Sequence, residues 1–164
     1  MTEKRDPVLP VDQAARGLAR DLVRGASTAA LAVLHPDTGA PHVTRIAFGL
    51  SRKGTMLTLV SALSLHTRAM RTDPRVSLLL GEIGAKGDPL THPRISIAAR
   101  AVFVSPADPD RPLLRDDWLG HHPKAKLYID FADFAFVRLE AESAALNGGF
   151  ARAYQLLRED LIMI

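Results

Sequence analysis

Six apolar stretches, several joined by short polar turns, restrict this chain to a small set of antiparallel β folds. Their residues alternate between two faces or are apolar throughout, and Gly, Pro and Asp occupy many of the links. Short links join neighbouring antiparallel strands, so the pattern favours one mostly antiparallel sheet. The strands are expected at 28–34, 42–50, 56–61, 75–81, 94–105 and 134–145.

Six strands are more than one flat sheet with a single buried face requires. Closure of the sheet into a barrel would remove its exposed edge strands. A helical period of apolar residues predicts a flanking helix at 11–24, which Gly25 ends. Further helices are expected at 108–119, 123–131 and 151–161. The prediction is therefore an α+β, mainly β, single domain over 1–164: a six-stranded antiparallel barrel with flanking helices, in which residues 1–10 are flexible.

Composition excludes several classes of protein. The 164 residues include no Cys, which rules out disulfides, thiolate metal sites and a cysteine nucleophile. The chain has no run of membrane-span length and no apolar signal segment, so we expect a cytoplasmic protein without a membrane partner. Basic residues are interspersed with acidic ones, and aromatic residues make up only 5% of the chain. Both features argue against a protein that binds nucleic acid. His121 and His122 are adjacent, so we expect a capping or surface pair and no metal site.

The stretch from Val60 to Arg68 has the composition of a phosphate site. We expect a strand end, a polar turn and the first turn of a short helix, which the Ser64 hydroxyl can cap. The free N–H groups at a helix start carry the positive end of the helix dipole. His66 and Thr67 lie at the same place, so hydroxyls, amides and cations converge there. This combination predicts a phosphate-bearing cofactor.

Four stretches, in their order and spacing, carry a family resemblance across most of residues 14–157. The first is Thr44-Arg45-Ile46-Ala47, and the second runs from Val60 through Asp73-Pro74-Arg75-Val76-Ser77-Leu78-Leu79. The third is Gly87-Asp88-Pro89-Leu90-Thr91-His92-Pro93-Arg94. The fourth runs from His122-Pro123-Lys124-Ala125 through Phe131-Ala132-Asp133-Phe134 to Gly148-Gly149-Phe150-Ala151-Arg152-Ala153. Together they resemble the flavin-binding split-barrel family of pyridoxamine 5′-phosphate oxidase, nearest its haem-utilisation (HugZ-type) branch.

The resemblance implies a six-stranded split barrel that forms a homodimer, with flavin mononucleotide (FMN) held between the subunits. Arg45 matches an arginine that reaches the phosphate, for which its guanidinium offers a bidentate partner. The residues alone leave other readings open. Arg45 could be an exposed strand residue, His66 an ordinary residue of the helix's first turn, and Ser61 and Thr67 common turn and cap residues. Arg94 could form an ion pair at the subunit interface, for instance with Asp88. The cofactor-binding residues that the family pattern implies are Arg45, Ile46, Ala47, Val60, Ser61, Ser64, His66, Thr67 and Arg94.

The chain also departs from the family pattern. His66 stands where the oxidases have lysine, which predicts weaker or pH-dependent flavin binding. The only Trp is Trp118 and no R-L-x-P ending is present, so oxidation of a vitamin B6 phosphate is not expected. The last histidine is His122, which argues against the histidine ligand that haem-degrading relatives carry in a C-terminal tail.

The leading hypothesis is an FMN-binding protein that acts as a flavin-dependent oxidoreductase on an unidentified small molecule. The flavin would carry the chemistry, and the protein would supply position and electrostatics. The alternatives are a haem-binding or haem-degrading split-barrel protein and a non-catalytic flavin-binding module. No side chain stands out as an acid or a base, so no catalytic residue is predicted.

Overall fold

The described part of the chain is built around one sheet of nine strands. The computed structural model describes residues 8–161. Its strands are β1 (Val8–Leu9), β2 (Thr28–Leu34), β3 (Pro41–Ala47), β4 (Gly49–Leu50), β5 (Met56–Ser61), β6 (Arg75–Leu80), β7 (Arg94–Phe103), β8 (Phe134–Asn147) and β9 (Ala153–Leu157). Its helices are α1 (Gln13–Gly25), α2 (Leu65–Thr72), α3 (Arg111–His121) and α4 (Arg158–Leu161), with 3-10 turns η1 (Pro89–Thr91) and η2 (Pro123–Leu127).

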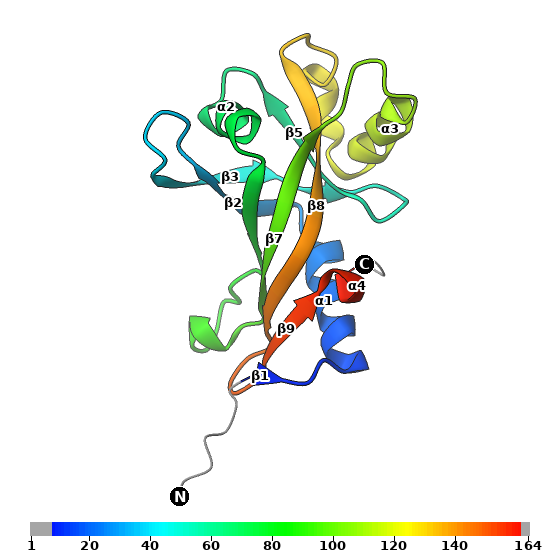
Figure 1. The fold of residues 1–164 in the computed structure, drawn as a ribbon. Coiled ribbons are helices and arrows are strands. Elements are labelled where there is room, and N and C mark those ends of the chain that lie inside the picture. Colours follow the sequence, from blue (N-terminus) through cyan, green and yellow to red (C-terminus); the bar gives the residue numbers. More distant parts are fainter. Residues whose placement is uncertain (1–7, 162–164) are drawn as a thin grey trace, which may run out of the picture.

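The long strand β8 is where the sheet divides. It pairs with β7 along nearly its whole length, in antiparallel register. On its other edge, β5 covers residues 134–138 and β9 covers residues 143–147. The main path therefore runs β1-β9-β8-β7-β6-β2-β3, while β5 and β4 branch from β8. Figure 1 shows β8 along the length of the molecule, with α2 and α3 at one end and α1, α4 and β9 toward the other.

The sheet returns on itself between β3 and β5, which closes the barrel. The hydroxyl of Thr58 on β5 donates a hydrogen bond of 2.8 Å to the carbonyl of Ala47 at the end of β3. One buried apolar cluster fills the barrel and the contact with α1. A second cluster, which includes Trp118 and Phe136, packs α3 and η2 against β5 and β8. These two cores hold α3 and η2 beside the end of β3.

Helix α1 forms where the sequence predicts it. Asp12 caps its first turn by accepting a hydrogen bond of 2.7 Å from the backbone N–H of Ala15. Ala15, Ala19 and Val23 recur every four residues and are fully buried, so small side chains bring the helix close to the sheet. In the described part of the chain, no helix has the length and apolar character needed to span a membrane.

The predicted closing helix at 151–161 is wrong. Residues Ala153–Leu157 form β9, and only Arg158–Leu161 is helical. Tyr154 and Leu156 are buried while Gln155 and Leu157 are exposed, which is the two-residue period of a strand. Pairing with the free edge of β8 therefore overrides a local pattern that also fits a helix.

Three further segments differ in kind from the predictions, and the bounds of β6, β7, β8 and α3 differ by one to three residues. The strand expected at 42–50 is interrupted at Phe48, where the chain leaves β2 and continues as β4 beside β5. The helix expected at 123–131 is a 3-10 turn that ends at Leu127. Within the segment predicted to be flexible, Val8–Leu9 forms β1 parallel to β9, and residues 1–7 lie outside the described residues. Nine strands in the described chain thus replace the expected six because β1, β4 and β9 are added.

Candidate functional site

The predicted phosphate corner, formed by Ser61, Ser64, His66 and Thr67, uses two of its three hydroxyls internally. The Ser61 hydroxyl donates to the carboxylate of Asp133 at 2.8 Å, and the Thr67 hydroxyl donates to the Ser61 carbonyl at 2.7 Å. Ser64 occupies the N-cap position of α2, but its side chain makes no capping hydrogen bond, so the predicted hydroxyl cap is wrong. The corner therefore holds a carboxylate beside the Ser61 and Thr67 hydroxyls, whose protons are already donated, and the Ser64 hydroxyl, whose proton is not.

The cations of this corner are also unsuited to a phosphate. Burial lowers the pKa of His66 below its ordinary 6.5, and the nearby His42 lowers this pKa further, so the imidazole is mostly neutral at neutral pH. Arg68 is paired with Asp37 on the turn between β2 and β3 at 3.0 Å. Neutral His66 and the Asp133 carboxylate together give this corner little positive charge of its own.

Arg45, Ile46 and Ala47 lie on β3 and line a groove of about 590 Å³. Arg45 is exposed, whereas Ile46 turns into the barrel core, as alternation along a strand requires. The opposite wall of the groove comes from the end of α3 and from η2. Its lining residues there are His121, His122, Pro123, Lys124, Ala125 and Tyr128. The groove therefore lies between two walls of different chemistry. The β3 wall carries a guanidinium, and the α3–η2 wall carries imidazoles and an ammonium.

The two histidines of this groove differ in availability. His122 Nε2 lies 2.7 Å from the Phe48 carbonyl, which can only accept, so Nε2 carries the proton and donates it. The His122 ring also packs on Trp118 at 4.3 Å between ring centroids. His121 is exposed, and its ring makes no hydrogen bond to a described residue. His122 is thus a structural residue, and His121 is free to bind a ligand.

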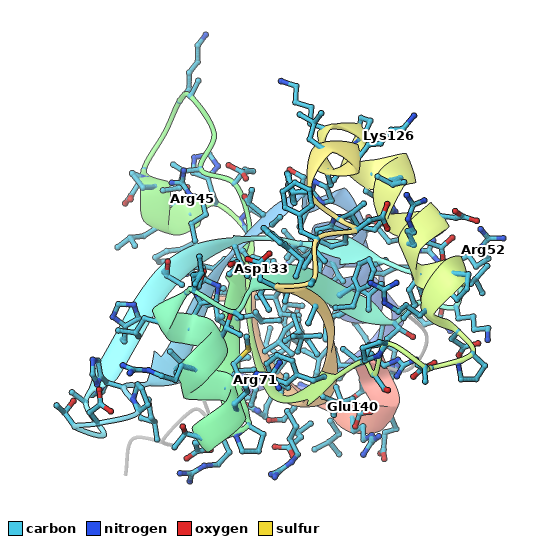
Figure 2. The ribbon with its side chains drawn as sticks, turned by 90° about the horizontal axis from the view of Figure 1, so that it is seen from above. Arg45, Arg52, Arg71, Lys126, Asp133 and Glu140 are labelled. Carbon is cyan, nitrogen blue, oxygen red and sulfur yellow. The ribbon has the colours of Figure 1, made fainter. Side chains whose placement is uncertain are left out.

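The groove and the phosphate corner are neighbours on the molecule. The ring of Tyr128, which lines the groove, lies 4.9 Å from the ring of Phe134. Phe134 is in turn the β8 partner of Ser61 at the end of β5. Seen from above, Asp133 lies nearer the middle of the molecule than Arg45 or Lys126 of η2 (Figure 2). The phosphate corner and the groove therefore lie side by side, and the cations Arg45 and Lys124 line the groove.

Val60 and Arg94, the two remaining candidates, serve the fold. The Val60 side chain is buried in the barrel core. Arg94 donates a hydrogen bond of 3.0 Å to the Leu90 carbonyl and makes no ion pair with Asp88. Asp88 instead caps η1 by accepting from the Leu90 N–H at 2.9 Å. Within this chain, Arg94 therefore braces the loop between β6 and β7, and an ion pair across a subunit interface stays a prediction.

Sequence reasoning missed Lys124, Tyr128 and Asp133 as site residues. Lys124 lies within His122-Pro123-Lys124-Ala125, the start of a stretch that carried the family resemblance. The resemblance could therefore have indicated the α3–η2 wall of the groove. Asp133 lies in the same stretch, but its contact with Ser61, 72 positions away along the chain, had no local signal. The contribution of this carboxylate is visible only after β5 and β8 have paired.

Comparison with known proteins identifies a family and relatives of this chain. Residues 16–147 match the family described as pyridoxamine 5′-phosphate oxidase. The non-canonical heme oxygenase HOZ of Arabidopsis thaliana, a chloroplastic protein, is 33% identical over 116 residues, which are 71% of this chain and 34% of HOZ. The chain thus spans about a third of the length of that relative.

Two solved structures share the fold over most of the chain. A heme binding protein from Mycobacterium smegmatis superposes with a TM-score of 0.82 at 27% identity, over 94% of this chain and 62% of that one. The protein Atu2129 from Agrobacterium tumefaciens, described as of unknown function, superposes with a TM-score of 0.80 at 35% identity, over 96% and 65% of the two chains. Both comparison chains extend beyond the part that this protein matches.

Proposed function

Because the chain belongs to the pyridoxamine 5′-phosphate oxidase family of split-barrel proteins, we propose that it uses this fold to bind haem. The binding site is the groove between β3 and the α3–η2 segment. The names of two relatives support this choice over a flavin, since one is a heme oxygenase and another a heme binding protein. The FMN hypothesis drawn from the sequence becomes the second candidate.

The residues of the groove fit a haem. A haem is a flat apolar ring with two carboxylates at one edge, and Arg45 and Lys124 supply cations for those carboxylates. His121 is exposed on the same groove, and imidazole is a common ligand of haem iron. The observation that carries the proposal is this exposed histidine in a groove that two cations also line, beside a corner with little positive charge of its own. When bound, the haem would supply iron at which O₂ chemistry takes place.

The protein carries its own reporter for the test. Trp118, the only tryptophan, packs on His122 at the back of the groove, so haem bound there will quench its emission. We expect added haem to produce a Soret band and to quench Trp118 in proportion. His121→Ala should weaken haem binding at least about tenfold and move the Soret band, because it removes the proposed iron ligand.

His35→Ala, which changes a histidine of the β2–β3 turn outside the groove, is the matched control and should bind haem as the wild type does. Equal affinity and an unchanged Soret band in His121→Ala would reject His121 as the ligand. Absence of both the band and the quenching would reject haem binding. The finer proposal, that bound haem is degraded, predicts loss of the Soret band when a reductant is added in the presence of O₂.

FMN is tested in the same titration. One observation favours it as the second candidate: the Ser64 hydroxyl is not used as a cap, so it remains available at the start of α2. If FMN rather than haem binds, flavin fluorescence will fall on addition of protein. Asp133→Asn should then strengthen FMN binding, because it removes the negative charge from the corner and retains an acceptor for the Ser61 hydroxyl.

A further inference from the structure

A second cavity, of about 310 Å³, opens where β8 loses a neighbour. Strand β5 leaves the edge of β8 after Arg138, and β9 begins only at Ser143. In the described chain, residues 139–142 therefore have β7 on one side and no strand on the other. The cavity shares no lining residue with the β3–η2 groove, so it is a separate feature of the fold.

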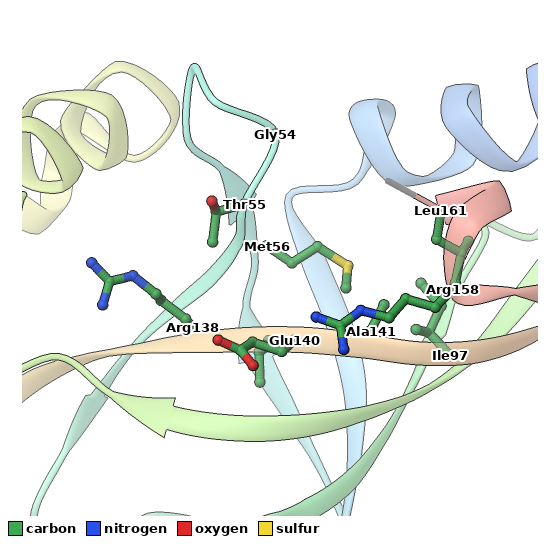
Figure 3. Close-up of a pocket in the computed structure, with 10 residues that line it drawn as sticks. Gly54, Thr55, Met56, Ile97, Arg138, Glu140, Ala141, Arg158 and Leu161 are labelled. Atoms are coloured by element: carbon green, nitrogen blue, oxygen red, sulfur yellow. The ribbon is translucent and has the colours of Figure 1, made fainter. Parts of the chain in front are cut away.

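The cavity has an apolar floor and two charged walls. Met56, Ile97 and Leu161 are buried and form part of the floor. Arg158 and Glu140 line the same cavity and are exposed, and their side chains make no hydrogen bond or ion pair with a described residue. In Figure 3 the Arg158 side chain extends along β8 toward Glu140. One cation and one anion are thus free above an apolar surface.

The other charges near this cavity already have partners. Arg138 points away from Arg158 in Figure 3 and pairs with Asp108 at 2.9 Å. Arg100, which faces Glu140 from β7, lies 3.9 Å from Glu142 instead. Arg158 and Glu140 are therefore the charged groups of the cavity that remain to bind a ligand.

We propose that this cavity binds a small aliphatic α-amino acid in its zwitterionic form. The ligand carboxylate pairs with Arg158, its ammonium group pairs with Glu140, and its side chain covers the apolar floor. Glu140 would repel a ligand that carries only a negative charge, and Arg158 would repel one that carries only a positive charge. A ligand with both charges can pair with both residues. The small volume suits a side chain of the size of leucine. This inference does not depend on haem binding.

Calorimetric titration of the full chain with L-leucine tests the proposal. We expect binding of L-leucine, and binding at least about tenfold weaker of 4-methylpentanoate and of 3-methylbutylamine, each of which lacks one of the two charges. The methyl signal of Met56, assigned with Met56→Leu, should shift as L-leucine is added. No heat and no shift at millimolar L-leucine would overturn the proposal, as would equal binding of a singly charged analogue.

Variants then locate the site. Arg158→Ala and Glu140→Gln should each weaken L-leucine at least about fivefold, because each removes one charge-assisted hydrogen-bond partner. Arg24→Ala removes an exposed arginine that does not line the cavity and should leave the affinity unchanged. Thermal unfolding of all three confirms that they fold. Undiminished affinity in Arg158→Ala and Glu140→Gln would overturn the assignment, whereas the haem titration and Trp118 emission report on the other groove.

Discussion

His66 is half-buried beside His42, and both conditions act against its protonation. Burial lowers its pKa below the ordinary 6.5, and the Coulombic effect of the nearby His42 lowers this pKa further. The unfolded chain regains the ordinary value, so below it the unfolded state binds more protons than the folded state. The contribution of His66 to stability is therefore full above the ordinary pKa, and it is lost as the pH falls from there toward the folded-state pKa.

Urea unfolding at about pH 7.5 and at about pH 5.5 measures this loss. His66→Gln removes the titration and keeps a polar side chain, so we expect a smaller decrease in unfolding free energy between the two pH values than in the wild type. His35→Gln, outside the His42–His66 contact, is the control and should retain the wild-type decrease. An identical decrease in His66→Gln and wild type would contradict the prediction.

At the scale of elements, α1 and α2 begin in different ways. Asp12 accepts a hydrogen bond in the first turn of α1, whereas the Ser64 side chain makes none at the start of α2. We expect Asp12→Ala to lower the unfolding free energy by about 1 kcal/mol, the usual value of an N-cap, and Ser64→Ala to change it by much less. Chemical denaturation of the two variants makes this comparison. Equal losses would show that Ser64 caps α2 in solution.

The whole molecule presents an apolar flank beside Arg45. Val43, Leu79 and Ile83 are 65%, 44% and 68% exposed and line one cavity of about 570 Å³ with Arg45. Burial of exposed apolar surface stabilises association. The sequence predicts a homodimer, and we propose that a second copy covers this flank, so that Arg45 lies beside the dimer contact.

Light scattering on the purified chain tests the dimer. Val43→Glu places a charge in the flank and should convert a dimer to a monomer at micromolar concentration, because a buried unpaired charge is costly. Leu63→Glu, at a side chain that is 90% exposed outside the flank, is the matched control and should leave the mass unchanged. A wild-type chain that is monomeric, or a Val43→Glu variant that stays dimeric, would reject this interface.

Much of the fold could be predicted from the sequence, and the candidate site only in part. The strands at 28–34 and 56–61 have the predicted bounds, and α1 lies within two residues of its prediction. The site prediction placed Arg45 in the groove but missed the wall opposite it. Residues of that wall come from α3 and η2, and their approach to β3 depends on the packing of Trp118 and Phe136 rather than on local pattern.

The sequence by itself determined the six predicted strand segments and the first helix, because alternation and turn residues act over a few neighbours. The order and spacing of four stretches carried the resemblance to the split-barrel family. Only the tertiary structure decided three matters: that 153–157 is a strand, that Ser61 donates to Asp133, and that His121 is free while His122 is not. Each depends on a partner far along the chain, such as the edge of β8 or the Phe48 carbonyl. A local pattern leaves such choices open, and the pairing and packing of distant segments resolve them.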